Sequence, residues 1–271
     1  MIGIHPRAIV APGATIGENV TIGPWCQVGT DVTIEDGVEL ISHVVVEGHT
    51  RIGAQTVLFP FSTVGMAPQD LKYKGEPTRC EVGARCKIRE HVTINRGTVT
   101  GSGVTIVGDD VLLMAGVHVA HDCVVGNGVV IANSVLMGGH VTIGDNAVIG
   151  GAAAIRQNTR IGRAAMIGGM SGVEADVIPF GMVMGERAYL AGLNVVGLKR
   201  RGYVRTQIHA VRAAFRLMFL GEGVFAERIA EARDTYGQEM LVAELLAFID
   251  SAGPRRLIQA KVVDEQDEDA G

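Results

Sequence analysis

Aliphatic residues recur at every sixth position over about two-thirds of this chain. The series runs from Ile4 to Val64, returns from Val82 to Ile94, and continues after a second break from Val107 to Val173. All 26 of its positions are aliphatic apart from Met137, although only 47% of the residues are apolar. A helix needs apolar residues three and four apart and a simple strand needs alternation, so neither element explains a period of six.

The remaining positions of each six-residue unit are constrained as well. Position two is Gly in 13 of the 26 units, and position five is Ala, Ser, Thr, Val or Cys in every unit except the one with Pro68. We therefore expect each unit to form one flat side of a three-sided prism, with parallel coils about 4.8 Å apart. The pattern predicts about eight to nine coils, with the position-one aliphatic side chains filling the interior.

Two segments interrupt the repeat, and a different pattern follows it. Residues 65–81 and 100–106 leave the six-residue register, and we expect them to form loops on a functional face. The sequence predicts a β-helix over 1–190 and a small helical domain over 191–260, with breaks at 221–223 and at Gly237. Residues 261–271 are polar and acidic, and we expect them to be disordered.

Charge is distributed unevenly along the chain. The formal net charge is −5, but Asp264, Glu265, Asp267, Glu268 and Asp269 supply five negative charges near the end of the sequence. Residues 199–218 carry six basic side chains and no acidic one, which indicates either a solvated helix face or a dock for an acidic partner or a phosphate group. A negative net charge argues against non-specific binding of nucleic acid.

The cellular compartment is inferred from the lack of membrane and secretory signals, and the role of the cysteines from their positions in the repeat. No run of 18 apolar residues occurs, and the N-terminal sequence MIGIHPRAIV does not resemble a secretory signal, so we expect a cytoplasmic protein without a membrane span. Cys26, Cys86 and Cys123 fall at position five, where a small apolar residue is wanted. Cys80 lies in the first interruption and is expected to be a free thiol.

Three of the eight histidines come together when the repeat is folded into coils. A coil has about 18 residues, so position 139 stacks over His121, with His140 beside it and His118 around the same corner. Such a cluster is typical of a general base, of a metal site or of polar surface. The spacing alone leaves these three interpretations open.

The repeat resembles the left-handed parallel β-helix of the hexapeptide-repeat acyltransferase superfamily. Longer segments resemble one family within it, the UDP-N-acetylglucosamine O-acyltransferases that act in lipid A biosynthesis. The two most specific are QDLKYKGEPTR at 69–79 and GLNVVGLKRRG at 192–202; the others are IGPWCQVG, SHVVVEGHT, VTINRGT, HVAHDCVVGN and GGHVTIGD. The left-handed sense comes from this resemblance, because the general crossover rule favours the right-handed form.

The resemblance implies a reaction and roles for individual residues. An (R)-3-hydroxyacyl chain would pass from acyl carrier protein to the 3-hydroxyl of UDP-N-acetylglucosamine, without a metal or cofactor. His121 would act as the general base, Asp122 would orient it, and the N–H of Gly139 would bind the oxyanion. The implied substrate-binding residues are Asp70, Lys72, His118, His140, Gln157, Asn194, Arg200 and Arg201.

The same resemblance implies further parts of the enzyme. Gly169 and Met170 would measure the acyl chain, and Arg205, Arg212 and Arg216 would dock the acidic carrier protein. The sites would lie between adjacent subunits of a homotrimer.

The chain also departs from the family pattern, and this keeps other functions open. Asn95 and Arg156 stand where His is common, and Val196 stands where a Glu contacts the nucleotide base. One alternative is the same reaction on a 3-amino UDP-sugar. Two others are a zinc enzyme resembling the γ-class carbonic anhydrases, which use a three-His site, and a non-catalytic hexapeptide scaffold.

Overall fold

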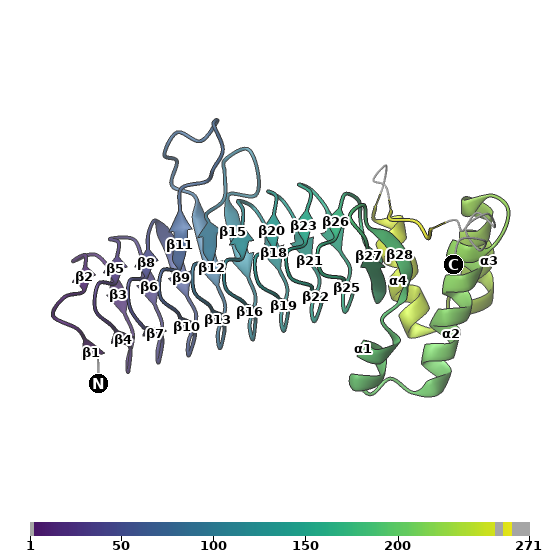
Figure 1. Ribbon diagram of the computed structural model, residues 1–271, viewed down its shortest axis with the longest axis horizontal. Helices are drawn as coiled ribbons and strands as arrows, with labels where there is room; N and C mark the ends of the chain where they lie inside the picture. The colour runs from purple at the N-terminus through teal and green to yellow at the C-terminus, as the bar shows by residue number, and fades with distance from the viewer. Residues whose placement is uncertain (1–2, 253–256, 262–271) are drawn as a thin grey trace, which may run out of the picture.

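The computed structural model describes residues 3–252 and 257–261, and most of that chain winds into a parallel β-helix (Figure 1). Three sheets run along the column as the three faces of a prism. Within uninterrupted coils the paired residues are 18 apart, as in the pairing of Val130 with both Leu112 and Val148. The predicted geometry of one side per six residues and three sides per coil is therefore confirmed.

The strands are short and alternate among the three faces. The first sheet contains β1 (Gly3–Ile4), β4 (Thr21–Ile22), β7 (Glu39–Leu40), β10 (Val57–Leu58), β13 (Lys87–Ile88), β16 (Leu112–Leu113), β19 (Val130–Ile131), β22 (Val148–Ile149), β25 (Met166–Ile167), β27 (Gly181–Met184) and β28 (Tyr189–Leu193). The second contains β2 (Ile9–Val10), β5 (Gln27–Val28), β8 (Val45–Val46), β11 (Thr63–Met66), β14 (Thr93–Asn95), β17 (His118–Val119), β20 (Leu136–Met137), β23 (Ala154–Ile155) and β26 (Gly172–Val173). The third contains β3 (Thr15–Ile16), β6 (Thr33–Ile34), β9 (His49–Ile52), β12 (Arg79–Val82), β15 (Val104–Val107), β18 (Val124–Val125), β21 (Thr142–Ile143) and β24 (Arg160–Ile161).

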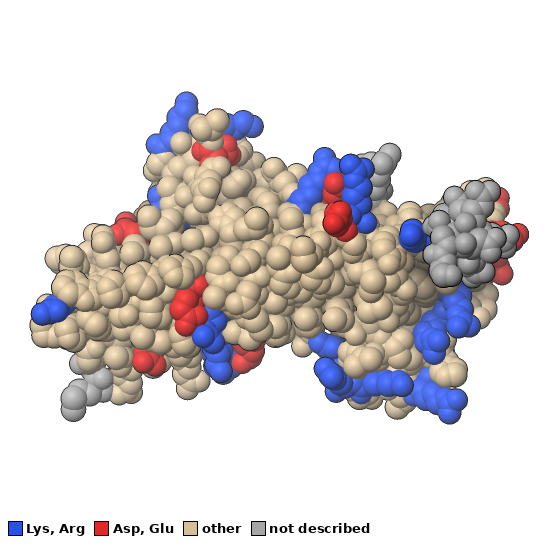
Figure 2. All heavy atoms as spheres, viewed as in Figure 1, with Lys and Arg blue, Asp and Glu red and all other residues tan. Residues whose placement is uncertain are grey.

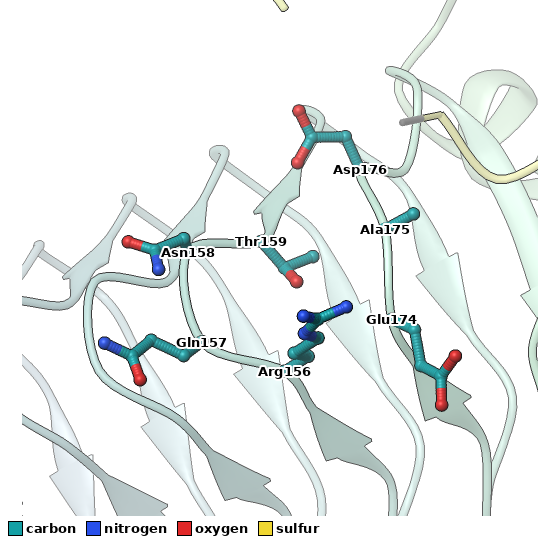
Figure 3. Close-up of a pocket in the computed structure, with 7 residues that line it drawn as sticks. All are labelled: Arg156, Gln157, Asn158, Thr159, Glu174, Ala175 and Asp176. Carbon is teal, nitrogen blue, oxygen red and sulfur yellow. The ribbon is translucent and has the colours of Figure 1, made fainter. Parts of the chain in front are cut away.

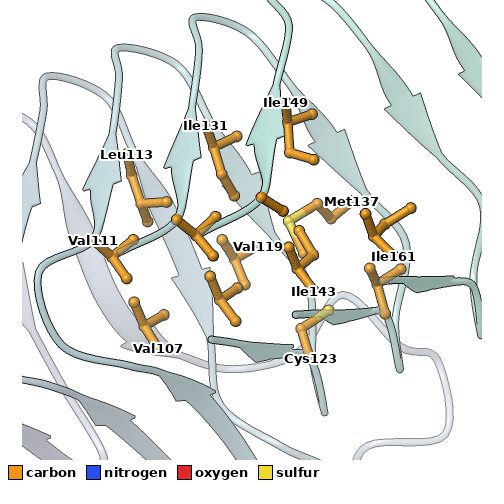
Figure 4. Close-up of a cluster of buried hydrophobic side chains, with 14 of the residues drawn as sticks. Val107, Val111, Leu113, Val119, Cys123, Ile131, Met137, Ile143, Ile149 and Ile161 are labelled. Carbon is orange, nitrogen blue, oxygen red and sulfur yellow. The ribbon is translucent and has the colours of Figure 1, made fainter. Parts of the chain in front are cut away.

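The position-one aliphatic residues form the interior of the column, as predicted. Every one of them from Ile22 to Val173 is buried, and Figure 4 shows a central part of this core. The first coil is the exception, because no coil lies beneath it in the described part of the chain: Ile4 is 44% exposed and Val10 and Ile16 are only half-buried.

The two loops have different boundaries from those expected. The first loop covers only 67–78, because β11 continues to Met66 and β12 already begins at Arg79. The second loop covers 96–103, because β14 ends at Asn95 and β15 begins at Val104. The inserted residues hide the register, so counting in sixes cannot show where each strand resumes.

One consequence of these boundaries is that the prediction for Cys80 was wrong in its location. Cys80 is a free thiol, but it lies in β12, paired with Thr50 and Thr105, and it is completely buried in the column. Cys26, Cys86 and Cys123 are buried free thiols, as expected. Burial raises the pKa of Cys80 and of Cys123 to about 12, so neither thiol supplies a thiolate nucleophile at neutral pH.

A group of helices closes the C-terminal end of the column (Figure 1). The helices are α1 (Val195–Arg200), α2 (Arg205–Phe215), which continues into the π-helix η1 (Arg216–Leu220), α3 (Phe225–Tyr236) and α4 (Met240–Asp250). Breaks fall at 221–224 and 237–239, where the glycines predict them. Within the described residues, no helix has both the length and the apolar character needed to cross a membrane. The expected disordered tail lies, apart from Lys261, outside the described residues.

Arginines of the last coils fasten the helices to the β-helix. The guanidinium of Arg163 donates to both carboxylate oxygens of Glu244 on α4 and to the hydroxyl of Tyr203. Arg160 stacks on the ring of Phe248, with 4.3 Å between its Cζ and the ring centroid. Helices thus cover the C-terminal end of the column, whereas no helix or strand of the described residues covers its N-terminal end.

Candidate active site

A His–Asp pair occupies the corner between the second and third faces, near the middle of the column. His121 Nδ1 lies 2.8 Å from Oδ2 of Asp122, and the Asp122 side chain is completely buried. An ionised Asp122 can only accept this hydrogen bond, so it selects the tautomer with the proton on Nδ1. The other ring nitrogen, Nε2, is then left as a base.

The loop over 96–103 holds the carboxylate of Asp122. Backbone N–H groups of Thr98 and Gly103 donate to it at 3.1 Å, and the hydroxyls of Thr98 and Ser102 donate at 2.6 and 3.1 Å. Burial alone would raise the pKa of Asp122, but the hydrogen bonds from Thr98, His121 and Ser102 outweigh burial and hold that pKa below its usual range. The carboxylate is therefore ionised at neutral pH.

These residues of the loop were missed by the sequence reasoning. Thr98, Ser102 and Gly103 carry no signal of their own, although Thr98 ends the VTINRGT segment. Thr105, whose hydroxyl accepts the N–H of Asp122 at 2.8 Å, was assigned to a loop but lies in β15.

Gly139 stacks directly on His121 in the next coil, as the 18-residue coil predicts. A Cβ added at Gly139 would lie 2.5, 2.7 and 3.1 Å from three atoms of the His121 ring, and the first two distances are too short for a real contact. Among the described residues, the N–H of Gly139 meets no hydrogen-bond acceptor, whereas its carbonyl accepts from Asn158 at 3.0 Å. This N–H is free to donate to an oxyanion that forms beside the imidazole.

We expect Gly139→Ala to lower kcat by about 10- to 100-fold, because the new methyl group displaces the His121 ring by a fraction of an ångström or more. Steady-state kinetics of the purified variant test this. Gly3→Ala is the matched control, since a Cβ at Gly3 meets only Thr21 Oγ1, at 4.0 Å. Equal rates for the Gly139 variant and the control would show that the close packing has no catalytic role.

His118 and His140 flank the pair. His118 Nδ1 lies 2.7 Å from the hydroxyl of Thr93, and burial, together with the nearby His121, lowers the pKa of His118. The ring of His140 meets that of His121 edge to face at 5.0 Å, and its Nε2 lies 4.0 Å from Asp122 Oδ2. The structure thus brings together His118, His121, Asp122, Gly139 and His140, as the sequence predicts.

Among the described residues, the group here with the spacing to hold a metal ion contains two histidines and an aspartate, not three histidines. Ligand atoms of His121, Asp122 and His140 lie within 4.8 Å of one another. Asp122 already accepts hydrogen bonds from the loop over 96–103 and from His121, so coordination would require it to give up some of them. The donor set fits a hydrogen-bonded acid–base pair better than a metal centre.

Gln157 lies one coil beyond Gly139 and lines a cavity of about 360 Å³ (Figure 3). The cavity is lined by Arg156, Gln157, Asn158, Thr159, Glu174, Ala175 and Asp176. The N–H of Asn158 donates to the Gly139 carbonyl, so this cavity begins one coil beyond Gly139 and two coils beyond His121. Arg156, which was noted in the sequence analysis only because His is common at that position in the family pattern, places a cation in this cavity.

Asp70 and Lys72 lie on the loop over 67–78, which projects from the column (Figure 1). Asp70 Oδ1 accepts the N–H of Lys72 at 2.9 Å. The loop is tied down by Tyr73, whose hydroxyl accepts from Arg96 at 2.8 Å. The Lys72 side chain is exposed, and no contact in the described residues joins it to the histidine cluster.

Asn194, Arg200 and Arg201 lie at α1, far along the column from that loop (Figure 1). The Asn194 amide accepts from Gly197 N and donates to the Ala164 carbonyl, so it caps the helix. Arg201 donates to the carbonyls of Gly197 and Asn146, and burial and the neighbouring Arg163 lower its pKa. Of these three residues, only Arg200 is exposed and forms no side-chain hydrogen bond to the described residues.

The residues expected to measure an acyl chain lie at the corner between the first and second faces. Met170 is 74% exposed, and a Cβ at Gly169 would lie 3.3 Å from the Gly151 carbonyl oxygen. Arg205, Arg212 and Arg216 are exposed along α2 and at the start of η1.

Comparison with known proteins gives matches along nearly the whole chain. The family model described as "Udp N-acetylglucosamine O-acyltransferase; Domain 2" matches residues 176–258, and a hexapeptide-repeat transferase model matches 105–139. The chain is 58% identical to an acyl-[acyl-carrier-protein]–UDP-N-acetylglucosamine O-acyltransferase of Azorhizobium caulinodans over 94% of both chains. It is 48% identical to the enzyme of the same name from Rhizobium johnstonii, over 94% of this chain and 93% of the other.

Solved structures agree with these matches. LpxA from Acinetobacter baumannii superposes with a TM-score of 0.90 at 40% identity, covering 95% of this chain and 99% of the other. The UDP-N-acetylglucosamine O-acyltransferase of Moraxella catarrhalis superposes with a TM-score of 0.91 at 39% identity, covering 94% and 99%. The predicted fold class, a left-handed parallel β-helix followed by a small helical part, is confirmed.

Proposed function

The chain belongs to the acyl-[acyl-carrier-protein]–UDP-N-acetylglucosamine O-acyltransferases, and from that premise we propose how its own residues perform the reaction. It transfers an acyl group from acyl carrier protein to UDP-N-acetylglucosamine in lipid A synthesis. The N-acylation, zinc-enzyme and scaffold alternatives are not favoured, because the relatives at 58% and 48% identity are O-acyltransferases by name.

We infer that the acyl group is an (R)-3-hydroxyacyl chain and that the acceptor is the sugar 3-hydroxyl. Nε2 of His121 takes the proton of that hydroxyl while its oxygen attacks the thioester carbonyl. Asp122 stabilises the imidazolium, and the N–H of Gly139 donates to the oxyanion. The intermediate then expels the sulfur of the carrier arm as a thiolate, which accepts the proton from His121 and leaves as a thiol. The observation that carries this mechanism is the 2.8 Å contact between His121 and the buried Asp122.

The substrates are proposed to contact residues from more than one subunit. His118, His140 and Gln157 line the site beside the His–Asp pair, whereas Asp70 and Lys72 lie on the loop over 67–78. Asn194, Arg200 and Arg201, proposed for the nucleotide, lie at the far end of the column. A single chain does not join these groups, and this separation supports a homotrimer with each site between adjacent subunits.

The rest of the proposal concerns the donor. Gly169 leaves room for the acyl chain, and Met170 beside it limits the groove. Arg205, Arg212 and Arg216 dock the carrier protein, which is a co-substrate; the proposed reaction uses no cofactor and takes place in the cytoplasm. Neither nucleic acid nor a membrane span enters it.

Mixing two inactive variants tests both the mechanism and the shared site. If His121 of one subunit works with Lys72 of the next, a trimer of His121→Ala and Lys72→Ala chains contains some intact sites. Every trimer that contains both kinds of chain has both native residues at one of its three sites, so we expect about a third of native activity. Co-expression with two affinity tags and assay of doubly purified trimers measure it.

The matched control is a mixture of His121→Ala and Asp122→Ala chains. These residues belong to one subunit's share of the site, so no mixed site is intact and activity should stay at the level of the single variants. Recovery in the control, or none in the test mixture, contradicts a site shared in this way.

A further inference from the structure

A groove runs along α2 on the side that faces α1 and β28. One part, of about 440 Å³, is lined by Val195, Lys199, Tyr203, Arg205, Ile208, His209 and Arg212. A second part, of about 200 Å³, is lined by Gly192, Leu193, Val195, Arg212, Phe215, Arg216 and Leu220. Val195 and Arg212 line both parts, so the two form one groove. Its floor is apolar and its rim carries the basic side chains.

The groove is cationic and lacks a counter-charge of its own. None of the residues that line it is acidic, and its lysine and arginines form no ion pair with the described residues. Figure 2 shows Lys and Arg gathered over α1 and α2, with no Asp or Glu among them in that view. Four cations beside an apolar floor suit an extended acidic peptide.

The chain itself contains such a peptide, and the described residues just before it run toward the groove. Ala260 forms a parallel bridge with Leu190, and Leu190 N donates to the Gln259 carbonyl at 2.9 Å. The chain at 259–261 therefore runs in the same direction as β28, whose last residue, Leu193, lines the groove. Leu193 is three residues beyond Leu190, and Asp264 is four residues beyond Ala260.

The segment 264–269 has a chain length and a negative charge that match the length and the positive charge of the groove. Five of the six residues at 264–269 are acidic. At about 3.3 Å per extended residue, this segment covers distances of roughly 13–30 Å from Ala260, whereas the helical turns from Arg205 to Arg216 span only about 16 Å.

We propose that the acidic segment 264–269 docks in this groove and competes there with the acyl carrier protein. The competition rests on the proposed function, which assigns Arg205, Arg212 and Arg216 to the carrier. The docking itself does not, because it concerns only contacts within the chain. An acidic carrier must then displace an acidic segment from the same cations before it delivers its acyl group.

Zero-length carbodiimide coupling of the full-length protein tests the docking without any activity. Carboxylates of 264–269 should couple to the amine of Lys199, the one lysine that lines the groove, and mass spectrometry of the digest detects the product. Lys261, close to the segment in sequence, is the internal standard, and Lys87, on β13, is the distant control. Coupling to Lys199 should fall at least about fivefold in an Arg212→Ala, Arg216→Ala variant, since the cations draw the segment in.

Kinetics test the competition. The tail is neutralised by Asp264→Asn, Glu265→Gln, Asp267→Asn, Glu268→Gln and Asp269→Asn. At low ionic strength we expect KM for the acyl carrier protein to fall about fivefold with kcat unchanged, and the difference to vanish near 0.5 M salt, where the Debye length is only about 4 Å. With acyl-pantetheine as donor, which has no acidic protein, the two enzymes should be equal.

The coupling and kinetic experiments test separate parts of the proposal: the docking, the competition and its electrostatic origin. No Lys199 coupling above that of Lys87 overturns the docking. Coupling without a change in KM overturns the competition and places the carrier elsewhere, which contradicts the assigned dock but leaves the His121 mechanism untouched. A fall in KM with acyl-pantetheine as well overturns the electrostatic explanation.

Discussion

Replacing His121 by alanine is expected to lower kcat by about 10²- to 10⁴-fold, the usual contribution of a general base. The ring nitrogen that takes the hydroxyl proton is lost, while the N–H of Gly139 and the substrate contacts stay in place. KM for UDP-N-acetylglucosamine should therefore change little. The measurement is initial rates with saturating acyl carrier protein at several sugar-nucleotide concentrations.

The control for this variant is His49→Ala. His49 lies on β9, is exposed, and faces Asp31 at 3.9 Å, away from the histidine cluster. It should retain the native kcat, and both variants should unfold at nearly the native temperature. A His121→Ala enzyme that turns over at the native rate would falsify the assignment of the base.

Replacing Asp122 is expected to reduce both activity and stability. Asp122→Asn keeps the size of the side chain, but its amide nitrogen is a donor facing donors: the N–H groups of Thr98 and Gly103 and the hydroxyls. We expect kcat to fall by about 10²-fold or more, because the His121 tautomer is no longer selected. The free energy of unfolding should fall by about 1–3 kcal/mol.

Kinetics and urea unfolding of the same preparation measure the two losses. Asp145→Asn is the control, since Oδ1 of Asp145 accepts the N–H of Asn127 at the corner between the third and first faces, away from the site. It should lose about 1 kcal/mol at most and no activity. An Asp122→Asn enzyme that resembles this control contradicts the orienting role.

The stability difference should also depend on pH, with a definite sign. The pKa of Asp122 is lowered in the folded protein, so the unfolded chain takes up the proton first as the pH falls. The stabilisation is complete above the ordinary aspartate pKa of about 3.9 and is lost as the pH falls through the lower folded value. The gap between native and Asp122→Asn unfolding free energies should therefore narrow below about pH 4.

The interior of the column is the part that sequence reasoning predicts best. A position such as Ile131 has one possible environment once the period of six is recognised, because each side of a coil presents one residue inward. The same rule predicts the stacking of Gly139 on His121. Both follow from a strict geometric repeat, in which position along the chain determines position in space.

The parts that escape prediction are those where the repeat is interrupted. Nothing in the spacing shows that Cys80 belongs to a strand, or that Ser102 reaches back to Asp122, because the length of an inserted loop is independent of the register around it. Asn194 illustrates a second limit. An amide that caps a helix and one that binds a nucleotide look the same in the sequence.

The two ends of the column differ in a way that affects how the protein comes apart. Each coil contacts only its neighbours, so loss of structure spreads from whichever end has the weakest contacts. The first coil leaves Ile4 and Ile9 exposed, whereas the last is fastened to α4 through Arg160 and Arg163. Fraying therefore begins at the N-terminal end and must pass through several complete coils before it reaches His121. The first coils therefore unfold before the coil that holds His121 and Asp122, and these two residues stay in place during the first stages of thermal unfolding.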